Sequence, residues 1–276
     1  MTNKTYEIIR YILLVLIAVV LLTPIYWLIM SSFRPADHIF KFSGAFSLET
    51  LIPFTLTFDN YLQALSGHIA QAMVNSLFVS ISTVVVGVFV NSLAGFAFAI
   101  FEFRFKKLLF MMVLLSFMMP FESIVIPLYS LMRHIGWTDT YFALILPEVA
   151  GGLVIFLFYQ FFRGIPKEIY EAARMDGATW WQIYYKMTMP LSGPTIATAS
   201  LMIFIHQWDA FFWPLVATSS EKLAVIQVAI ARNMTLEQAN WGAFFASASL
   251  AILIAMVPFF WLQKYYVKIV ITNADR

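Results

Sequence analysis

The sequence contains no cysteine, and only 12% of its 276 residues are charged, about half of the roughly 25% found in a typical soluble domain. The missing cysteine excludes a disulfide framework, a thiolate metal site and a cysteine nucleophile. The 17 basic and 15 acidic residues nearly balance, which argues against a disordered or nucleic-acid-binding chain. Hydrophobic residues make up 61% of the sequence, more than a soluble protein of this size can cover. We therefore expect the chain to lie in a lipid bilayer.

Six apolar segments, each with at most one acidic or basic residue, are long enough to cross a membrane, which takes roughly 20 residues. The predicted spans are residues 8–31, 73–101, 108–132, 140–162, 191–214 and 241–266. They leave a short N-terminus (1–7), two external loops (32–72 and 215–240), an internal loop (163–190) and a C-terminal tail (267–276). The predicted fold is an all-α polytopic membrane protein with a core of about residues 70–266.

The distribution of lysine and arginine predicts the orientation. Twelve of the 17 basic residues fall on one side of the predicted membrane, and such a side is normally cytoplasmic. They are Lys4, Arg10, Arg104, Lys106, Lys107, Arg163, Lys167, Arg174, Lys186, Lys264, Lys268 and Arg276. Both termini are then expected inside. The first span is longer than the apolar core of a signal peptide and lacks a following small-x-small cleavage site, so we expect a retained helix.

The internal loop carries strong local signals for two short helices. Pro166 suits a first helical turn, and Gly177 suits a helix C-terminus. Thr179 and Gln182 have the spacing of a capping box, which would open a second helix. From these residues alone, two readings remain open: an amphipathic helix pair resting on lipid headgroups, or a docking surface for a cytoplasmic partner.

The same loop resembles a spaced motif of ATP-binding-cassette (ABC) importer permeases. In that family Glu-Ala-Ala is followed after three residues by Gly, and after nine more by Ile-x-Leu-Pro. This chain has Glu171-Ala172-Ala173, then Gly177, then Met187–Pro190, with the spacing kept. Methionine replaces both Ile and Leu, a mild exchange between apolar residues of similar size.

Other motifs resemble the carbohydrate-uptake branch, and within it the MalG-like permeases of binding-protein-dependent systems. They are Ser32–Pro35, Asp59–Tyr61, Asn75–Leu77, Pro120, Ile126–Tyr129, Gly136–Tyr141, Leu144–Pro147 and Trp208–Leu215. One departure is the tail (267–276), which lacks the glycine-containing run common in the family. The resemblance covers nearly the whole chain.

The resemblance implies a type I importer permease in the plasma (inner) membrane of a bacterium or archaeon. Its implied partners are a second permease, two cytoplasmic ATPase subunits and an extracytoplasmic solute-binding protein. No G-x-x-x-x-G-K-[ST] phosphate loop occurs here, so ATP and Mg²⁺ would be bound by the ATPase subunits and this chain would not be an enzyme. The residues implied to couple ATP hydrolysis to transport are Glu171, Ala172, Ala173, Asp176 and Gly177. The implied solute is a sugar or oligosaccharide.

Two alternatives remain open at this point. Related permeases carry glycerol phosphate or a sugar acid, so the resemblance does not decide the solute. A stand-alone secondary transporter is a second alternative, but the inverted repeats expected of one are not evident. An intramembrane enzyme is not supported, because the four histidines show no metal-ligand spacing and no H-E-x-x-H motif occurs.

Several polar residues fall in the outer half of the predicted membrane, where a charge is costly. They are Glu122, Glu148, His206, Gln207 and Asp209, and Trp208 beside them is a further candidate because its ring could stack on a sugar. Their similar depth suggests a water-filled route for a polar solute. The alternative is that the carboxylates satisfy neighbouring helices and broken backbone, and that the tryptophan belongs to an interfacial belt. Asn75 and Asn91 are further candidates for hydrogen bonds between helices.

Overall fold

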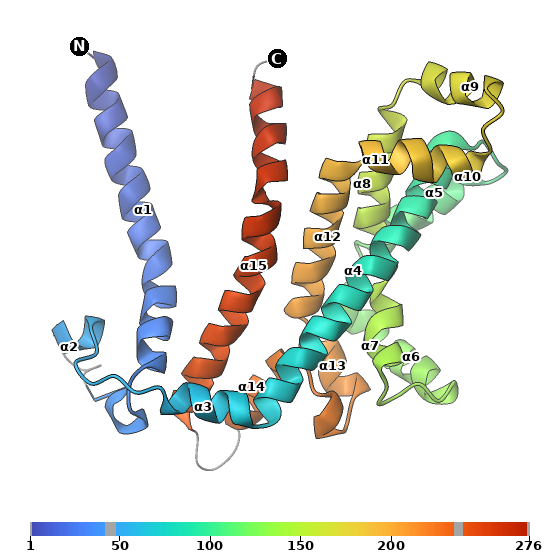
Figure 1. Ribbon diagram of the computed structural model, residues 1–276. Helices are drawn as coiled ribbons and strands as arrows, with labels where there is room; N and C mark the ends of the chain where they lie inside the picture. The colour runs from blue at the N-terminus through green and yellow to red at the C-terminus, as the bar shows by residue number, and fades with distance from the viewer. Residues whose placement is uncertain (1, 42–47, 235–239, 275–276) are drawn as a thin grey trace. The chain divides into compact units, whose positions relative to one another are not determined.

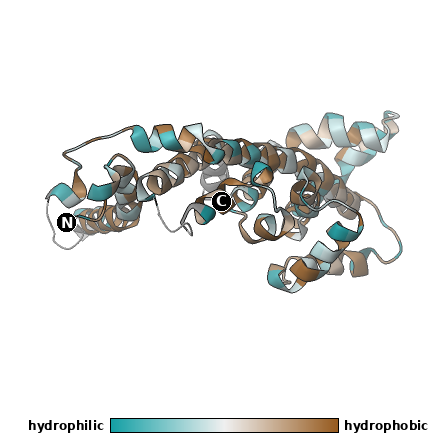
Figure 2. Cartoon of the chain, turned by 90° about the horizontal axis from the view of Figure 1, so that it is seen from below, coloured by the Kyte–Doolittle hydropathy of each residue, from teal (hydrophilic) through white to brown (hydrophobic). Residues whose placement is uncertain are grey.

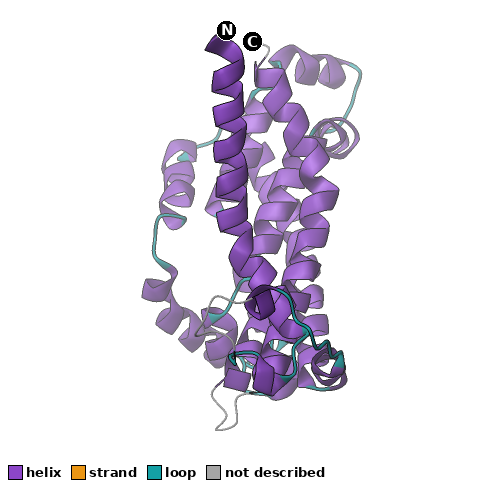
Figure 3. Cartoon of the chain, turned by 90° about the vertical axis from the view of Figure 1, so that its left-hand side faces the viewer, coloured by secondary structure: helices purple, strands orange, loops and turns teal. Residues whose placement is uncertain are grey.

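The computed structural model describes residues 2–41, 48–234 and 240–274, and every regular element in these residues is helical (Figures 1 and 3). This confirms the all-α prediction. The chain forms two compact units, residues 1–71 with 229–254 and residues 72–228 with 255–276. Figure 2 shows hydrophobic residues along the helices of both units, as expected for segments that lie in lipid.

The first unit contains two long apolar helices and short ones between them. Its elements are α1 (Thr2–Ser32), η1 (Ala36–His38), α2 (Leu48–Leu51), α3 (Asp59–Ser66), the end of α14 (Ile226–Met234) and the first part of α15 (Trp241–Ala274). Trp27 of α1 packs edge-on against Phe245 of α15, with ring centroids 5.2 Å apart. The buried Asn60 donates to the carbonyls of Ser32 and Arg34, which satisfies the end of α1.

The second unit contains most of the predicted core. Its elements are α4 (His68–Ile100, which begins in the first unit), α5 (Lys106–Ser116), α6 (Phe121–His134), α7 (Tyr141–Ile145), η2 (Leu146–Glu148), α8 (Gly152–Arg163), α9 (Lys167–Met175), α10 (Trp180–Gln182), the π-helical segment η3 (Ile183–Thr188), α11 (Met189–Leu191), α12 (Gly193–Trp208), α13 (Phe212–Ala217) and η4 (Glu221–Leu223), with the start of α14 and the end of α15. Within this unit, Figure 1 shows α9 and α10 at one end and α6 and α13 at the other.

Three of the spans that the sequence predicts as single helices are broken in the structure. The predicted span 108–132 is α5 followed by α6 at an angle of 103°, and the span 140–162 is α7–η2 followed by α8 at 44°. Pro120 precedes the first residue of α6, and a proline lacks the N–H needed to continue a helix through that point. The predicted span 191–214 is also divided, because α12 ends at Trp208 and α13 begins at Phe212.

Three helical segments of the described chain are long and apolar enough to cross a membrane unaided. They are Tyr6–Ser32, His68–Ile100 and Trp241–Leu262. The number rises to six if each bent helix pair counts as one span, the third pair being Trp180–Leu191 with Gly193–Trp208, bent by 82°. The helical part of the predicted tail continues α15 as far as Ala274, and residues 275–276 lie outside the described residues.

The second unit has two hydrophobic clusters that correspond to its two ends. One joins Val79, Leu144, Trp213 and Val228 with their neighbours near α6, α7 and α13. The other surrounds Phe96 and includes α8, α9 and η3. The two candidate functional regions lie beside these clusters.

Candidate functional site

The helix α9 of the internal loop is anchored by one face and exposed on the other. Tyr170 is the one residue of α9 that is buried, with 4% of its surface exposed. Burial raises the pKa of its phenol, which therefore remains protonated at neutral pH. Glu171 and Ala172 are exposed, and Met175 is 89% exposed. A short helix that presents apolar and acidic side chains on one face is suited to contact with another protein.

Gly177 ends this helix in a left-handed conformation, as the sequence predicts. Its φ is +81°, a value that glycine adopts without the steric cost that other residues meet. The Gly177 N–H donates to the Arg174 carbonyl and the Ala178 N–H to the Ala173 carbonyl, both at 3.0 Å. This is the pair of bonds of a Schellman motif, which closes a helix C-terminus. A methyl group added at Gly177 would meet no other atom within 4 Å.

The predicted capping box of the second helix is present. The Thr179 hydroxyl accepts from the Gln182 N–H, and the Gln182 side chain accepts from the Thr179 N–H. The helix that follows changes to the wider π-helical form over Ile183–Thr188, a change with no counterpart in the predicted elements. Isolated π-helical turns are uncommon and occur often at functional sites.

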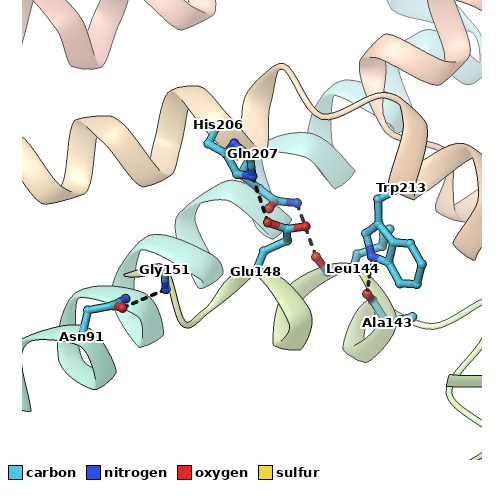
Figure 4. A network of polar contacts seen from close by, with 8 residues as sticks. All are labelled: Asn91, Ala143, Leu144, Glu148, Gly151, His206, Gln207 and Trp213. Atoms are coloured by element: carbon cyan, nitrogen blue, oxygen red, sulfur yellow. Dashed lines mark hydrogen bonds and ion pairs between the residues drawn. The ribbon is translucent and has the colours of Figure 1, made fainter. Parts of the chain in front are cut away.

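The second candidate region is an ion pair between two segments that are distant in sequence (Figure 4). The Glu148 carboxylate lies 2.9 Å from His206 Nε2, joining η2 to α12. The Glu148 side chain is only 14% exposed, whereas that of His206 is 70% exposed. Asp209 contributes a further electrostatic interaction with His206. We call Glu148, His206, Gln207 and Asp209 the polar seam.

Neighbouring hydrogen bonds fix the polar seam against α7. The buried Gln207 donates to the Leu144 carbonyl at 3.4 Å, and Trp213 donates to the Ala143 carbonyl at 2.8 Å (Figure 4). The Gln207 Oε1 atom is buried and has no hydrogen-bond partner. An unpaired buried acceptor costs free energy, so the seam holds one unused hydrogen-bonding position.

Asn91 of α4 closes the break between η2 and α8. Its amide nitrogen donates to the Val149 carbonyl at 2.7 Å. Its oxygen accepts from the Gly151 N–H at 2.9 Å, the bond drawn in Figure 4. Asn91 is fully buried. Because lipid cannot hydrogen-bond, broken backbone at membrane depth requires such partners. The residue that satisfies this break is thus the asparagine, and Glu148 is left to pair with His206.

The remaining predicted residues are not gathered at the seam. Trp208 is 3% exposed, and its ring stacks on Phe204, so it packs inside the unit and presents no face to a solute. Glu122 is an exposed residue in the first turn of α6, and no hydrogen bond or ion pair joins it to the seam among the described residues. Asn75 donates to the carbonyls of Lys222 and Ala224. It therefore connects α4 to the segment before α14 by hydrogen bonds.

One contact between two loops was not predicted from the sequence. The Asp139 carboxylate accepts from the Ser219 N–H and from the N–H and hydroxyl of Ser220, at 3.0–3.1 Å. These bonds, those to Ser220 first, hold the pKa of Asp139 below its usual value. Asp139 has a positive φ of 58°, a conformation that aspartate tolerates better than most residues. An aspartate at this position was therefore only a weak sequence signal for a turn.

A family model matches most of the chain. Residues 87–271 match the model described as "Binding-protein-dependent transport system inner membrane component". The chain is 31% identical over 274 residues to the arabinooligosaccharides transport system permease protein AraQ of Halalkalibacterium halodurans, covering 97% of this chain and 96% of that protein. It is 28% identical over 272 residues to the sn-glycerol-3-phosphate transport system permease protein UgpE of Rhizobium meliloti, covering 95% of each.

A solved structure shares the fold. A chain of a bacterial ABC transporter involved in the import of the acidic polysaccharide alginate superposes with a TM-score of 0.85 at 21% identity, covering 96% of this chain and 98% of the other. At that identity the likeness establishes the fold alone. Both candidate regions lie within the residues that the family model matches.

Proposed function

Because the chain belongs to the family of binding-protein-dependent transport system inner membrane components, we propose that it forms one half of the transmembrane pathway of a carbohydrate ABC importer. The other half is a second permease. Both termini face the cytoplasm of a bacterial or archaeal cell, and a solute-binding protein delivers the solute from outside. The exposed face of α9 carries this proposal, because it offers a contact surface at one end of the helical core.

The energy for transport comes from two ATPase subunits that bind ATP and Mg²⁺. The surface of α9 meets one of them through Glu171, Ala172, Ala173, Asp176 and Gly177. The acidic groups pair with basic groups on the ATPase, and the small alanine side chains permit a close approach between the backbones. The Schellman and capping-box bonds support this role, since they hold the two loop helices in a fixed shape.

The solute passes the polar seam, with Glu148 and His206 as the main contacts and Gln207, Asp209 and Glu122 as further candidates along the route. Imidazole, carboxylate and amide groups provide both donors and acceptors for hydroxyl groups. Gln207 is only 4% exposed, so a solute hydroxyl would reach its unpaired Oε1 only after the helices around it move apart. Trp208 takes no part beyond packing, since its ring is buried.

We favour an uncharged sugar or oligosaccharide over glycerol phosphate or a sugar acid. The seam contains two carboxylates and one histidine, while α7, η2, α12 and α13 contain no lysine or arginine. A site lined by negative charge repels an anionic solute, whereas arginine and lysine are the usual partners of phosphate and carboxylate. The AraQ relative, named for arabinooligosaccharides, agrees with this choice.

The test is reconstitution of the complete importer in liposomes. We expect a second permease and an ATPase to copurify with this chain, and ATP to drive uptake of a neutral oligosaccharide such as an arabino-oligosaccharide. Glycerol 3-phosphate and an oligouronate serve as acidic comparison solutes. Uptake that persists without ATP hydrolysis but stops when the proton gradient is collapsed would establish a secondary transporter instead.

A further inference from the structure

Phe96 of α4 is the point where the internal loop meets the spanning helices. It is 4% exposed. Its ring centroid lies 5.4 Å from that of Tyr184 in η3, 5.9 Å from that of Phe162 in α8 and 6.4 Å from that of Tyr170 in α9. Edge-to-face aromatic contacts of this kind add to simple apolar burial. The loop elements α9 and η3 therefore pack against α4 and α8 around this ring.

Within this packing, two buried hydroxyl groups join η3 to α4. The Tyr184 hydroxyl lies 2.7 Å from the Ser92 Oγ atom, and Ser92 donates to the Phe89 carbonyl at 3.0 Å. Tyr184 is 3% exposed and Ser92 is fully buried. A buried side-chain hydrogen bond fixes direction as well as distance, whereas aromatic packing alone allows sliding.

The segment that carries Tyr184 is the π-helical part of the loop. It leads through α11 to α12, whose axis is bent by 82° from the preceding helices. A π-helical turn has i→i+5 hydrogen bonds, is rare, and occurs frequently at functional sites. Tyr184 is thus on the link between a rigid loop helix and a spanning helix.

We propose that Tyr184 and Ser92 are positioning residues that pass a displacement of the internal loop to α4. This rests on the proposed function, in which an ATPase displaces α9. The aromatic packing around Phe96 makes α9 and η3 move together, and the Tyr184–Ser92 hydrogen bond makes α4 follow. Without the bond, the rings slide past one another and part of the displacement is lost.

The experiment compares Tyr184→Phe, Ser92→Ala and the double variant in the complete reconstituted importer. ATP hydrolysis and uptake of a neutral oligosaccharide are measured in the same vesicles. We expect ATP hydrolysis to continue while the solute transported per ATP falls roughly two- to tenfold, the range for loss of one hydrogen bond. The double variant should be no worse than either single variant, because each removes the same bond.

Tyr185→Phe is the matched control, since Tyr185 is the next residue of η3 and is 45% exposed. It should leave the transport ratio unchanged. An unchanged ratio in both single variants, or additive losses in the double variant, would overturn the proposal. If hydrolysis and uptake fall together while the ATPase still copurifies, the two residues act in general stability and the proposal is also overturned. Failure of the unmodified importer to take up any solute with ATP would instead contradict the proposed function.

Discussion

The internal loop and the polar seam are held together over very different distances along the chain. The bonds that shape the loop helices join residues three to five positions apart, such as Thr179 with Gln182 and Ala173 with Ala178. The Tyr184–Ser92 bond, by contrast, ties the loop to α4. The bonds of the seam join residues 58 and 63 positions apart, such as Glu148 with His206 and Leu144 with Gln207. A locally bonded unit keeps its shape when its surroundings move, whereas a long-range contact changes whenever two helices shift.

This difference in the range of the hydrogen bonds fits the roles proposed for the loop, which meets an ATPase, and for the seam, which the solute passes. The loop is suited to receive a displacement and transmit it, because its internal bonds do not depend on the positions of the spans. The seam is suited to respond, because Glu148 lies at a break in one span and His206 lies near the end of another. The comparison can be tested by changing one region at a time.

The largest effect is expected at Asn91, which supports the seam region and has no bond to the internal loop among the described residues. Asn91→Leu leaves the Val149 carbonyl and the Gly151 N–H buried without partners. At about 1–3 kcal/mol for each group, the free energy of unfolding should fall by roughly 2–6 kcal/mol. Thermal unfolding of the purified complex in detergent measures this loss. Val85→Leu, at a position 64% exposed on the same helix, should unfold like the unmodified complex, and equal unfolding of Asn91→Leu would refute the role of Asn91.

The second-largest effect is expected from substitution of Gly177 in the internal loop. Gly177→Val forces a β-branched residue into a left-handed conformation, at a cost of about 1–2 kcal/mol or more. Uptake and ATP hydrolysis should become uncoupled while the seam is unaffected. Gly177→Asn should retain most activity, because asparagine tolerates this conformation. If Asn and Val are equally inactive, the surface at Gly177 rather than its backbone conformation determines coupling.

A smaller effect is expected from changes to the charges of the seam. Glu148→Gln keeps the shape of the side chain but removes its charge, and His206→Gln removes the imidazole. We expect either change to weaken the apparent affinity for a neutral oligosaccharide roughly two- to tenfold, since one hydrogen bond is altered, with ATP hydrolysis preserved. Concentration-dependent uptake measures the effect. Additive losses in the double variant would show that the two residues do not act as a pair.

The smallest effect is expected at Asp139, which lies in neither region and provides a reference. Its pKa is lowered in the folded chain, so its contribution to stability is present above the pKa of an unfolded aspartate and is lost as the pH falls through the folded value. Asp139→Asn should therefore reduce the free energy of unfolding at neutral pH by less than about 1 kcal/mol, because solvent screens this partly exposed group. The unfolding curves of the two proteins should differ at neutral pH and converge at strongly acidic pH. A difference that grows toward low pH would contradict this account.

The sequence predicts the internal loop well because proline, glycine and the capping pair act locally. The end of α9 at Gly177 and the capping box of Thr179 are confirmed. The breaks in the spans were missed because proline and glycine are common in membrane helices and a hydropathy pattern does not record a bend. Asn91 was recognised as a candidate for bonding between helices, but its two partners depend on how α4 packs against the break.

The similar depth of the polar residues was a partial guide to the seam. It grouped Glu148 with His206, which the structure brings into contact. It also grouped Glu122 with them, although Glu122 is an exposed residue of α6. Trp208, a candidate for stacking on a sugar, is buried against Phe204 instead. Depth along a span says nothing about the direction in which a side chain leaves the helix, and that direction depends on contacts between helices.

The shortness of α5 has a consequence for how the chain enters the membrane. Its 11 residues measure about 16 Å as an α-helix, little more than half of the roughly 30 Å hydrocarbon core. Gly152, at the start of α8, lies so close to α5 that an added methyl group would collide with the Val113 carbonyl and the Ser116 hydroxyl. A helix this short does not hold a transmembrane position by itself. We therefore expect α5 to become stably inserted during synthesis only after α8 has been made and the two have packed as a hairpin.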